Sequence, residues 1–147
     1  MNGLFGTSHA LDASVSYPAT ETISHGLRQL VSDVLVLIGG SCFYHIEAEM
    51  RYGKELVIRV FEYDVADAIQ RRVFRDGKMH LKFPQTRIIC WEARSSTPDR
   101  AVMSIEFPDG GTYDYSVEIF KFTDYDVGEL EARRMILLLP FCLLRLR

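Results

Sequence analysis

The most constraining feature of the chain is a pair of strand-like segments, Val31–Ile38 and Ser41–Met50, separated by Gly39 and Gly40. The first segment is apolar on both faces apart from one serine and Asp33, as expected for a central strand of a sheet. The second segment alternates apolar and polar residues, which is typical of a strand with one face in a core. Two strands joined by a short glycine-containing turn predict a β-hairpin.

The polar face of the second strand is unusually acidic. His45, Glu47 and Glu49 lie on the same side because side chains alternate along a strand, and the hairpin brings Asp33 within reach of them. Crowded carboxylates repel one another, and protonation, basic partners or a divalent cation can offset that repulsion. Mg²⁺ or Mn²⁺ suits such hard oxygen ligands, polarises a phosphate and activates water. Two alternatives remain open at this point: a solvated sheet face and a salt-bridge network.

The remaining pattern predicts an α/β fold made of one domain over residues 1–147, with an extended amino-terminal arm over about 1–21. We expect a mixed central sheet of four to five strands flanked by helices. The expected helices span Thr22–Val31 and Glu55–Asp76, the latter from its broad apolar stripe. A third helix begins near Asp126, where a capping box is indicated, and Pro140 kinks or ends it. The other expected strands are Thr86–Ala93, Ala101–Phe107 and a strand after the DGG turn at 109–111.

Bulk properties exclude several classes of protein. The net charge of −3 argues against a protein that coats DNA by charge alone, although a local basic patch remains compatible with it. The three cysteines show no CxxC spacing, which indicates buried free thiols in a reducing compartment and argues against a zinc site. The start of the chain lacks the pattern of a signal peptide, and its longest apolar run is too short to cross a bilayer. We therefore expect a cytoplasmic protein without a membrane partner.

Several motifs in order carry a resemblance: SDVLVLIGG, YHIEAEM, VIRVFEYDVADAI, FPDG and LEARRMILLLPF. Together they resemble the PD-(D/E)XK nuclease superfamily, and within it the recombination-promoting nuclease/transposase family, from about Leu4 to the end. The resemblance implies a restriction-endonuclease-like core and Mg²⁺-dependent (or Mn²⁺-dependent) hydrolysis of DNA phosphodiester bonds, linked to recombination or transposition. Asp33 matches the motif aspartate and Glu47 the motif glutamate. Both would bind the metal.

The chain departs from the motif at one position. Glu49 stands where the superfamily has lysine and this family usually has glutamine. Either Glu49 is a further metal ligand, or a nearby base such as Lys54 or Arg59 replaces the lysine, or catalysis is weak or lost. Relatives also place a glutamate on a helix before the first strand, and Glu21 is the nearest candidate here. That helix is missing or shortened, which leaves open that the sequence is a piece of a longer protein.

Other residues are accessory candidates. His45 is a hydrogen-bond partner of the carboxylates, a ligand or a proton shuttle. Arg59 and Tyr63 share a helix face; Arg59 either pairs with an acid or stabilises charge at a scissile phosphate.

The last group is basic and follows the long helix. These residues either interact with the helix C-terminus or contact the DNA backbone: Arg71, Arg72, Arg75 and Lys78.

Two functional expectations follow, beside a third possibility, a nuclease fold that acts on RNA or on a nucleotide-sized substrate. The first is a metal-dependent DNA endonuclease, plausible as a homodimer because cutting two strands needs two sites and the apolar arm needs something to pack on. The second is a catalytically inactive nuclease-fold module that binds DNA or another protein. The missing motif lysine and the acidic net charge favour the second.

Overall fold

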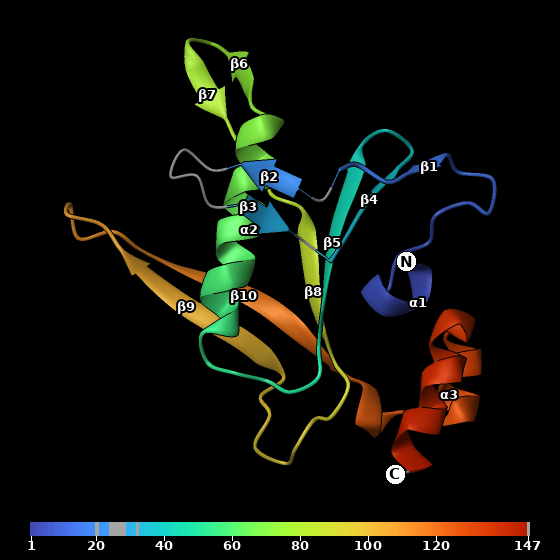
Figure 1. Ribbon diagram of the computed structural model, residues 1–147. Coiled ribbons are helices and arrows are strands. Elements are labelled where there is room, and N and C mark those ends of the chain that lie inside the picture. Colours follow the sequence, from blue (N-terminus) through green and yellow to red (C-terminus); the bar gives the residue numbers. More distant parts are fainter. Residues whose placement is uncertain (20, 24–28, 32, 147) are drawn as a thin grey trace.

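The computed structural model describes residues 1–19, 21–23, 29–31 and 33–146, with side chains over 1–19 and 33–143. Its centre is a six-stranded mixed sheet (Figure 1), so the protein is α/β and the sheet exceeds the expected four to five strands. Strands β5, β8 and β10 are parallel neighbours, and the other strands pair antiparallel. The order across the sheet is β1 (Val15–Ser16), β4 (Val34–Ile38), β5 (Cys42–Glu49), β8 (Gln85–Cys90), β10 (Thr112–Lys121) and β9 (Arg100–Glu106).

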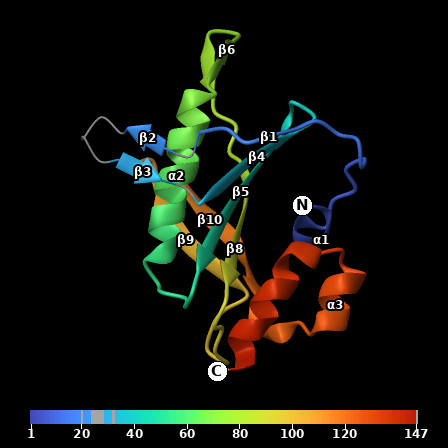
Figure 2. The ribbon, with the colours of Figure 1, turned by 45° about the vertical axis from the view of Figure 1, so that its right-hand side comes forward.

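Helices cover both faces of this sheet. On one face lies α2 (Leu56–Gln70); on the other lie α1 (Asn2–Phe5), α3 (Val127–Ala132) and the 3-10 helices η1 (Phe122–Asp124) and η2 (Ile136–Leu146) (Figures 1 and 2). Two short hairpins complete the fold, β2 (Glu21–Ile23) with β3 (Gln29–Val31), and β6 (Val73–Arg75) with β7 (Lys78–His80). Among the described residues, no helix is long and apolar enough to cross a membrane.

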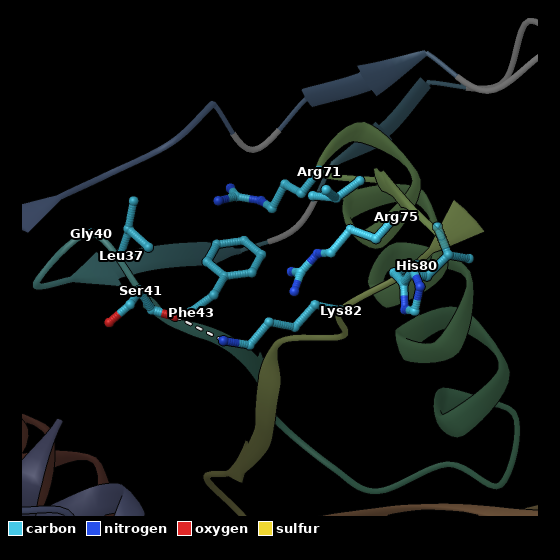
Figure 3. A pocket seen from close by; sticks show the side chains of 10 residues that line it. Leu37, Gly40, Ser41, Phe43, Arg71, Arg75, His80 and Lys82 are labelled. Atoms are coloured by element: carbon cyan, nitrogen blue, oxygen red, sulfur yellow. Dashed lines mark hydrogen bonds between the residues drawn. The ribbon is translucent and has the colours of Figure 1, made fainter. Parts of the chain in front are cut away.

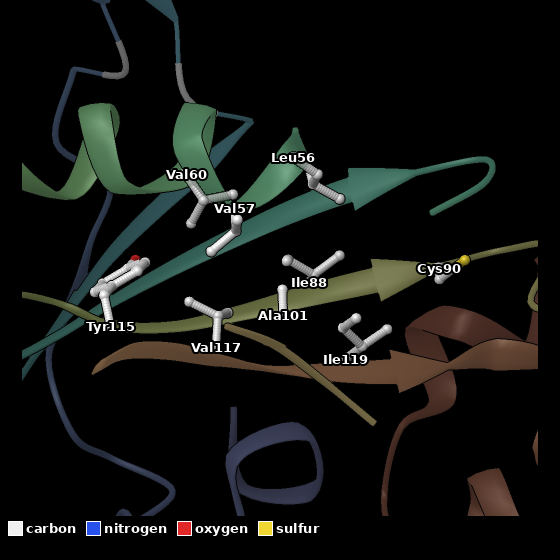
Figure 4. Packing of buried hydrophobic residues seen from close by; sticks show 9 residues of the cluster. All are labelled: Leu56, Val57, Val60, Ile88, Cys90, Ala101, Tyr115, Val117 and Ile119. Carbon is white, nitrogen blue, oxygen red and sulfur yellow. The ribbon is translucent and has the colours of Figure 1, made fainter. Parts of the chain in front are cut away.

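The core is divided by the alternation of side chains along the central strands. Ile88 of β8 is fully buried under α2, where it packs with Val57 and Val60 of the helix (Figure 4). Its neighbour Ile89 points to the opposite face and packs with Leu130 of α3. Each such aliphatic side chain contributes about 1.5–3 kcal/mol by leaving water. The apolar stripe of α2 therefore fixes that helix against the sheet.

The hairpin of β4 and β5 confirms the sequence prediction. Ile38 pairs with Cys42 and Val34 with Ile46. Gly39 and Gly40 form the turn with φ of 60° and 68°, the left-handed region that glycine enters without steric cost. Asp33 directly precedes Val34, so the register places it beside the residue after Ile46, which is Glu47.

The predicted helix Glu55–Asp76 was wrong at its C-terminal end. The helix starts at Leu56 as expected but ends at Gln70, and the chain then forms the β6–β7 hairpin. Asp76 and Gly77 occupy its turn with φ of 51° and 71°. An Asp-Gly pair favours such a two-residue hairpin turn, and that local preference ends the helix early. The hairpin projects beyond the sheet (Figure 2).

The predicted helix Thr22–Val31 was also wrong where the structure describes it. Residues 21–23 and 29–31 are antiparallel strands, with Thr22 opposite Leu30. Residues 24–28, including Gly26, lie outside the described part. Both ends carry β-branched residues, Thr22 and Ile23 at one end and Val31 at the other, and such residues favour strands.

The carboxy-terminal capping box is confirmed. The Asp126 side chain accepts from the Glu129 N–H, and the Glu129 side chain accepts from the Asp126 N–H. The α-helix is nevertheless only six residues long. Arg134 has φ of 57°, which ends it, and the chain continues as the 3-10 helix that contains Pro140.

The arm packs on its own sheet rather than needing a partner for its first apolar residues. Leu4 is buried, and the Phe5 ring lies 4.7 Å from the ring of Tyr44. His9 Nε2 lies 2.6 Å from the Tyr44 hydroxyl oxygen. Leu11, by contrast, is 94% exposed. The cysteines are free thiols as expected, but only Cys90 is fully buried.

Candidate functional site

The candidate site lies between β5 and α2. Glu47 is 3% exposed, although it carries a carboxylate, so its environment must replace the lost hydration. Arg59 Nη2 lies 2.8 Å from its Oε1, and His45 Nε2 lies 3.4 Å from its Oε2. The backbone N–H of Asp33 points to the same Oε2 at 3.5 Å. The basic partners that the sequence left open are thus present.

Asp33 sits at the rim of this arrangement. It is exposed, and its Oδ2 accepts a hydrogen bond of 2.8 Å from the backbone N–H of Ala48 on β5. The carboxylate of Asp33 is thereby attached to the strand that carries Glu47. Glu47 lies on β5, and Asp33 lies in the bend directly before the antiparallel neighbour β4, one residue beyond the pair Val34–Ile46.

Arg59 joins the other two carboxylates. It forms an ion pair with Glu49 as well as with Glu47, and it is 43% exposed. Burial lowers the pKa of the Arg59 guanidinium, but its hydrogen bond to Glu49 and the charges of Glu47 and Glu49 have the larger effect and raise the pKa, so the group stays cationic. The positive charge beside Glu47 and Glu49 therefore comes from helix α2.

His45 links Glu47 to a buried hydrogen-bond network. The Nδ1 of His45 lies 2.7 Å from Asp64 Oδ1, and both side chains are buried. Asp64 Oδ2 also accepts from the hydroxyls of Thr86 at 2.6 Å and Tyr115 at 2.5 Å. Asp64 thus accepts three hydrogen bonds, as a buried carboxylate requires.

The network fixes the protonation of its imidazole. Burial by itself lowers the pKa of His45, but hydrogen bonds to Asp64 and Glu47 and their charges raise it to about 9. The ring is therefore an imidazolium at neutral pH and donates to both carboxylates. Burial and the nearby Asp64 charge raise the pKa of Tyr115, which keeps its hydroxyl a donor.

Sequence reasoning missed the part of this network that is centred on Asp64. Asp64 and Asp67 are buried on the inner face of α2, at positions that its apolar stripe would otherwise fill. Asp64 follows Val57 by seven residues and Val60 by four, which is the spacing of one helix face. A polar residue at a core position was the available signal.

The other candidates lie apart from the carboxylates or at the edge of the site. Tyr63 is half-buried with its ring 6.1 Å from that of His45, and burial raises its pKa. Lys54 is exposed in the turn before α2 and makes no ion pair with any described residue. Glu21 lies in β2, and its side chain is outside the described part.

The basic candidates divide into two groups. Arg72 Nη1 donates to the Ile69 carbonyl at 2.9 Å, so it serves the end of α2. The Arg71 guanidinium lies 3.5 Å from the centre of the Phe43 ring. Arg75 and Lys78 are not on the helix but on opposite strands of the β6–β7 hairpin, where they form a cross-strand pair.

Comparisons with known proteins give no further identification. No protein-family model, no curated protein and no solved structure matches the chain.

Proposed function

We propose that the protein is a metal-dependent DNA endonuclease that hydrolyses phosphodiester bonds. The observation that carries the proposal is that Asp33, directly before β4, lies next to Glu47 of β5: its N–H points to Glu47 Oε2, its carboxylate accepts from the N–H of Ala48, and Arg59 pairs with Glu47. The hairpin, crossover helix and parallel strand formed by β4, β5, α2 and β8 agree with a restriction-endonuclease-like core, which we include in the proposal.

The donor set suits a hard cation that takes few protein ligands. Asp33 and Glu47 offer carboxylate oxygens, and Mg²⁺ is usually held by one or two carboxylates together with waters and substrate phosphates. Among the described residues, no group of three or more His, Cys, Asp and Glu side chains is placed to hold an ion. Glu49 is paired with Arg59. We therefore assign Asp33 and Glu47 as the ligands, and Glu49 as the residue that positions Arg59.

Each group of the site then has its own role in the proposed reaction. A bound Mg²⁺ or Mn²⁺ would polarise the phosphate and lower the pKa of a water. Arg59 is exposed enough to reach a phosphate and stabilises the charge that develops on its oxygens. His45, held by Asp64, fixes the carboxylate of Glu47.

The surface proposed for the DNA backbone is basic. It comprises Arg71, Arg75 and Lys78 at the far end of α2 and on the following hairpin. Arg72 is not included because its guanidinium is bonded to the helix end.

The second candidate is an inactive nuclease-fold module that binds DNA or another protein. It is favoured by the ion pairs of Arg59 with both Glu47 and Glu49, because these pairs leave the two carboxylates less free to bind a cation.

Plasmid nicking separates the two. Purified protein is incubated with supercoiled plasmid and Mg²⁺ or Mn²⁺, beside Asp33→Ala, Glu47→Ala and, as a matched control, Glu92→Ala. Glu92 is an exposed carboxylate that pairs with Arg51 instead. The endonuclease requires nicking by wild type and Glu92→Ala and none by the other two or with EDTA. Intact plasmid in every lane, together with a gel shift, would leave the binding module.

We also propose a homodimer, because cleavage of two strands needs two sites. Sedimentation analysis with and without DNA tests it. A monomer in both states would contradict it.

A further inference from the structure

A basic pocket of about 440 Å³ lies on the same side of the sheet as α2, at the end of that helix opposite Arg59 (Figure 3). Its walls come from the β4–β5 turn, the C-terminal end of α2, and the β6–β7 hairpin with the segment after it. The volume lies within the range of small-ligand sites, so the pocket has room for a nucleotide. We call it the hairpin pocket. Its polar lining consists of Ser41, Arg71, Arg75, His80 and Lys82.

The lining of the hairpin pocket is positively charged, and the charge of Arg71 also interacts with Asp67, which lies outside the lining. No carboxylate is among its lining residues. Arg71, Arg75 and Lys82 form no ion pair within 4.0 Å with any residue that the structure describes. Lys82 Nζ donates only to the Ser41 carbonyl, at 3.1 Å. Clustered cations without a counter-ion repel one another, and an anionic ligand relieves that repulsion.

Arg71 is the ordered element of the pocket. Its guanidinium carbon lies 3.5 Å from the centre of the Phe43 ring, and its Nε is buried and makes no hydrogen bond to any residue that the structure describes. A stacked guanidinium has already lost much of its side-chain entropy, so binding costs less. Its planar fork of donors matches the oxygens of a phosphate.

The hairpin presents its charges on one face. Residues directly opposite each other in an antiparallel pair share a face, and the pairs are Val73 with His80 and Arg75 with Lys78. Val73, Arg75 and His80 line the pocket, so Lys78 extends the same face outward. The other face carries the exposed pair Phe74 and Met79. Arg72 complements the helix dipole through its hydrogen bond to the Ile69 carbonyl, whereas the basic residues of the hairpin lie on the face that lines the pocket.

We propose that the hairpin pocket binds a phosphate group of a nucleotide, supplied either by a nucleic-acid strand or by a free nucleotide. For the strand, the inference rests on the proposed function and extends it. Phe43 and Glu47 lie four residues apart on the same face of β5, which is about 13 Å. A nucleic-acid strand that advances 3.4 Å per nucleotide covers this separation in about four nucleotides. The pocket would hold such a strand at a fixed distance from the carboxylates.

The test is equilibrium binding in EDTA, where cleavage plays no part. A fluorescently labelled single-stranded 20-nucleotide DNA is titrated with the full chain, and anisotropy gives Kd at several salt concentrations. The variants are Arg75→Ala and Lys82→Ala, both exposed, and Arg71→Gln. Each should weaken binding about tenfold, the size of one charge-assisted hydrogen bond. Each should also reduce the salt slope by about one. Arg72→Ala and Arg94→Ala remove the same charge outside the pocket and should change Kd less than twofold.

Competition identifies the source of the phosphate. Displacement of the DNA by adenosine monophosphate or pyrophosphate at micromolar concentration indicates a free nucleotide, and resistance to both indicates a strand. The proposal for the hairpin pocket is overturned if the three pocket variants bind the DNA with the wild-type Kd. It is also overturned if Arg72→Ala and Arg94→Ala weaken DNA binding as much as the pocket variants do. Plasmid nicking reports separately on the endonuclease: pocket variants can lose binding in a protein that never cuts, and a protein that cuts can bind without the pocket.

Discussion

Replacing Asp67 by asparagine should stabilise the protein at neutral pH. Asp67 is 3% exposed on the inner face of α2, and its Oδ2 accepts no hydrogen bond from the part of the chain that the structure describes. Burial raises its pKa from 3.8 to about 6, with the nearby charges of His45 and Arg71 opposing the rise. Converted fully, that shift is about 3 kcal/mol. Relaxation of the surroundings of the ionised carboxylate reduces it, and we expect about 2 kcal/mol.

The sign follows from proton linkage. The native state binds more protons than the unfolded state between pH 3.8 and 6, so the free energy of unfolding falls as pH rises through that window. Above pH 6 the whole penalty of an ionised Asp67 is present. Asp67→Asn removes it, so the variant should gain about 2 kcal/mol over wild type at pH 7 and about a third of that at pH 4.5.

Urea unfolding at pH 4.5, 5.5, 6.5 and 7.5, followed by the fluorescence of Trp91, measures this difference. The matched control is Glu62→Gln, which removes the same charge from an exposed position on the same helix. The reasoning is refuted if Asp67→Asn is less stable than wild type at pH 7.5, if its gain does not change with pH, or if Glu62→Gln reproduces it.

Three further changes test the packing and the site, each by urea unfolding at pH 7. Leu130→Ala opens a cavity at a fully buried position of α3 and should lower the free energy of unfolding by about 3 kcal/mol, whereas a loss below 1 would show that the core there is loose. Tyr115→Phe removes one of the three donors to Asp64 and should cost about 1.5 kcal/mol; no change would show that this hydroxyl does not stabilise the carboxylate. Arg59→Ala takes away the cation beside buried Glu47 and should cost about 2 kcal/mol, less than for a fully buried pair because Arg59 is partly exposed. It should also abolish any nicking, and retention of full activity would exclude its proposed role.

The parts of the fold that were predictable are those set by local rules. The hairpin of β4 and β5 follows from Gly39 and Gly40, whose positive φ values suit no other residue as well, and from alternation along the second strand. The start of α2 and the capping box at Asp126 are likewise local signals. The end of α2 was missed because the apolar pattern continues past Gln70, while the Asp76–Gly77 turn favours a hairpin more strongly.

The candidate site was only partly predictable for a different reason. Alternation places His45, Glu47 and Glu49 on one face, but it does not say what faces them. Arg59 reaches two of these carboxylates only because α2 crosses over β5, which is a property of tertiary packing. Thr86 and Tyr115 come from strands far along the chain and carry no mark in the sequence as partners of Asp64.

The hydrogen bonds of Asp64 also determine how α2 is seated. Sliding the helix by one turn would move its buried carboxylate about 5.4 Å away from His45, Thr86 and Tyr115 and leave four polar groups without partners. Apolar side chains alone tolerate such slippage far better. Arg59 and Arg71, the residue that follows the last helical position, lie twelve residues apart, which is about 18 Å along the helix axis. The separation of Arg59 and Arg71 is therefore fixed, and a ligand that contacts both residues must span about 18 Å.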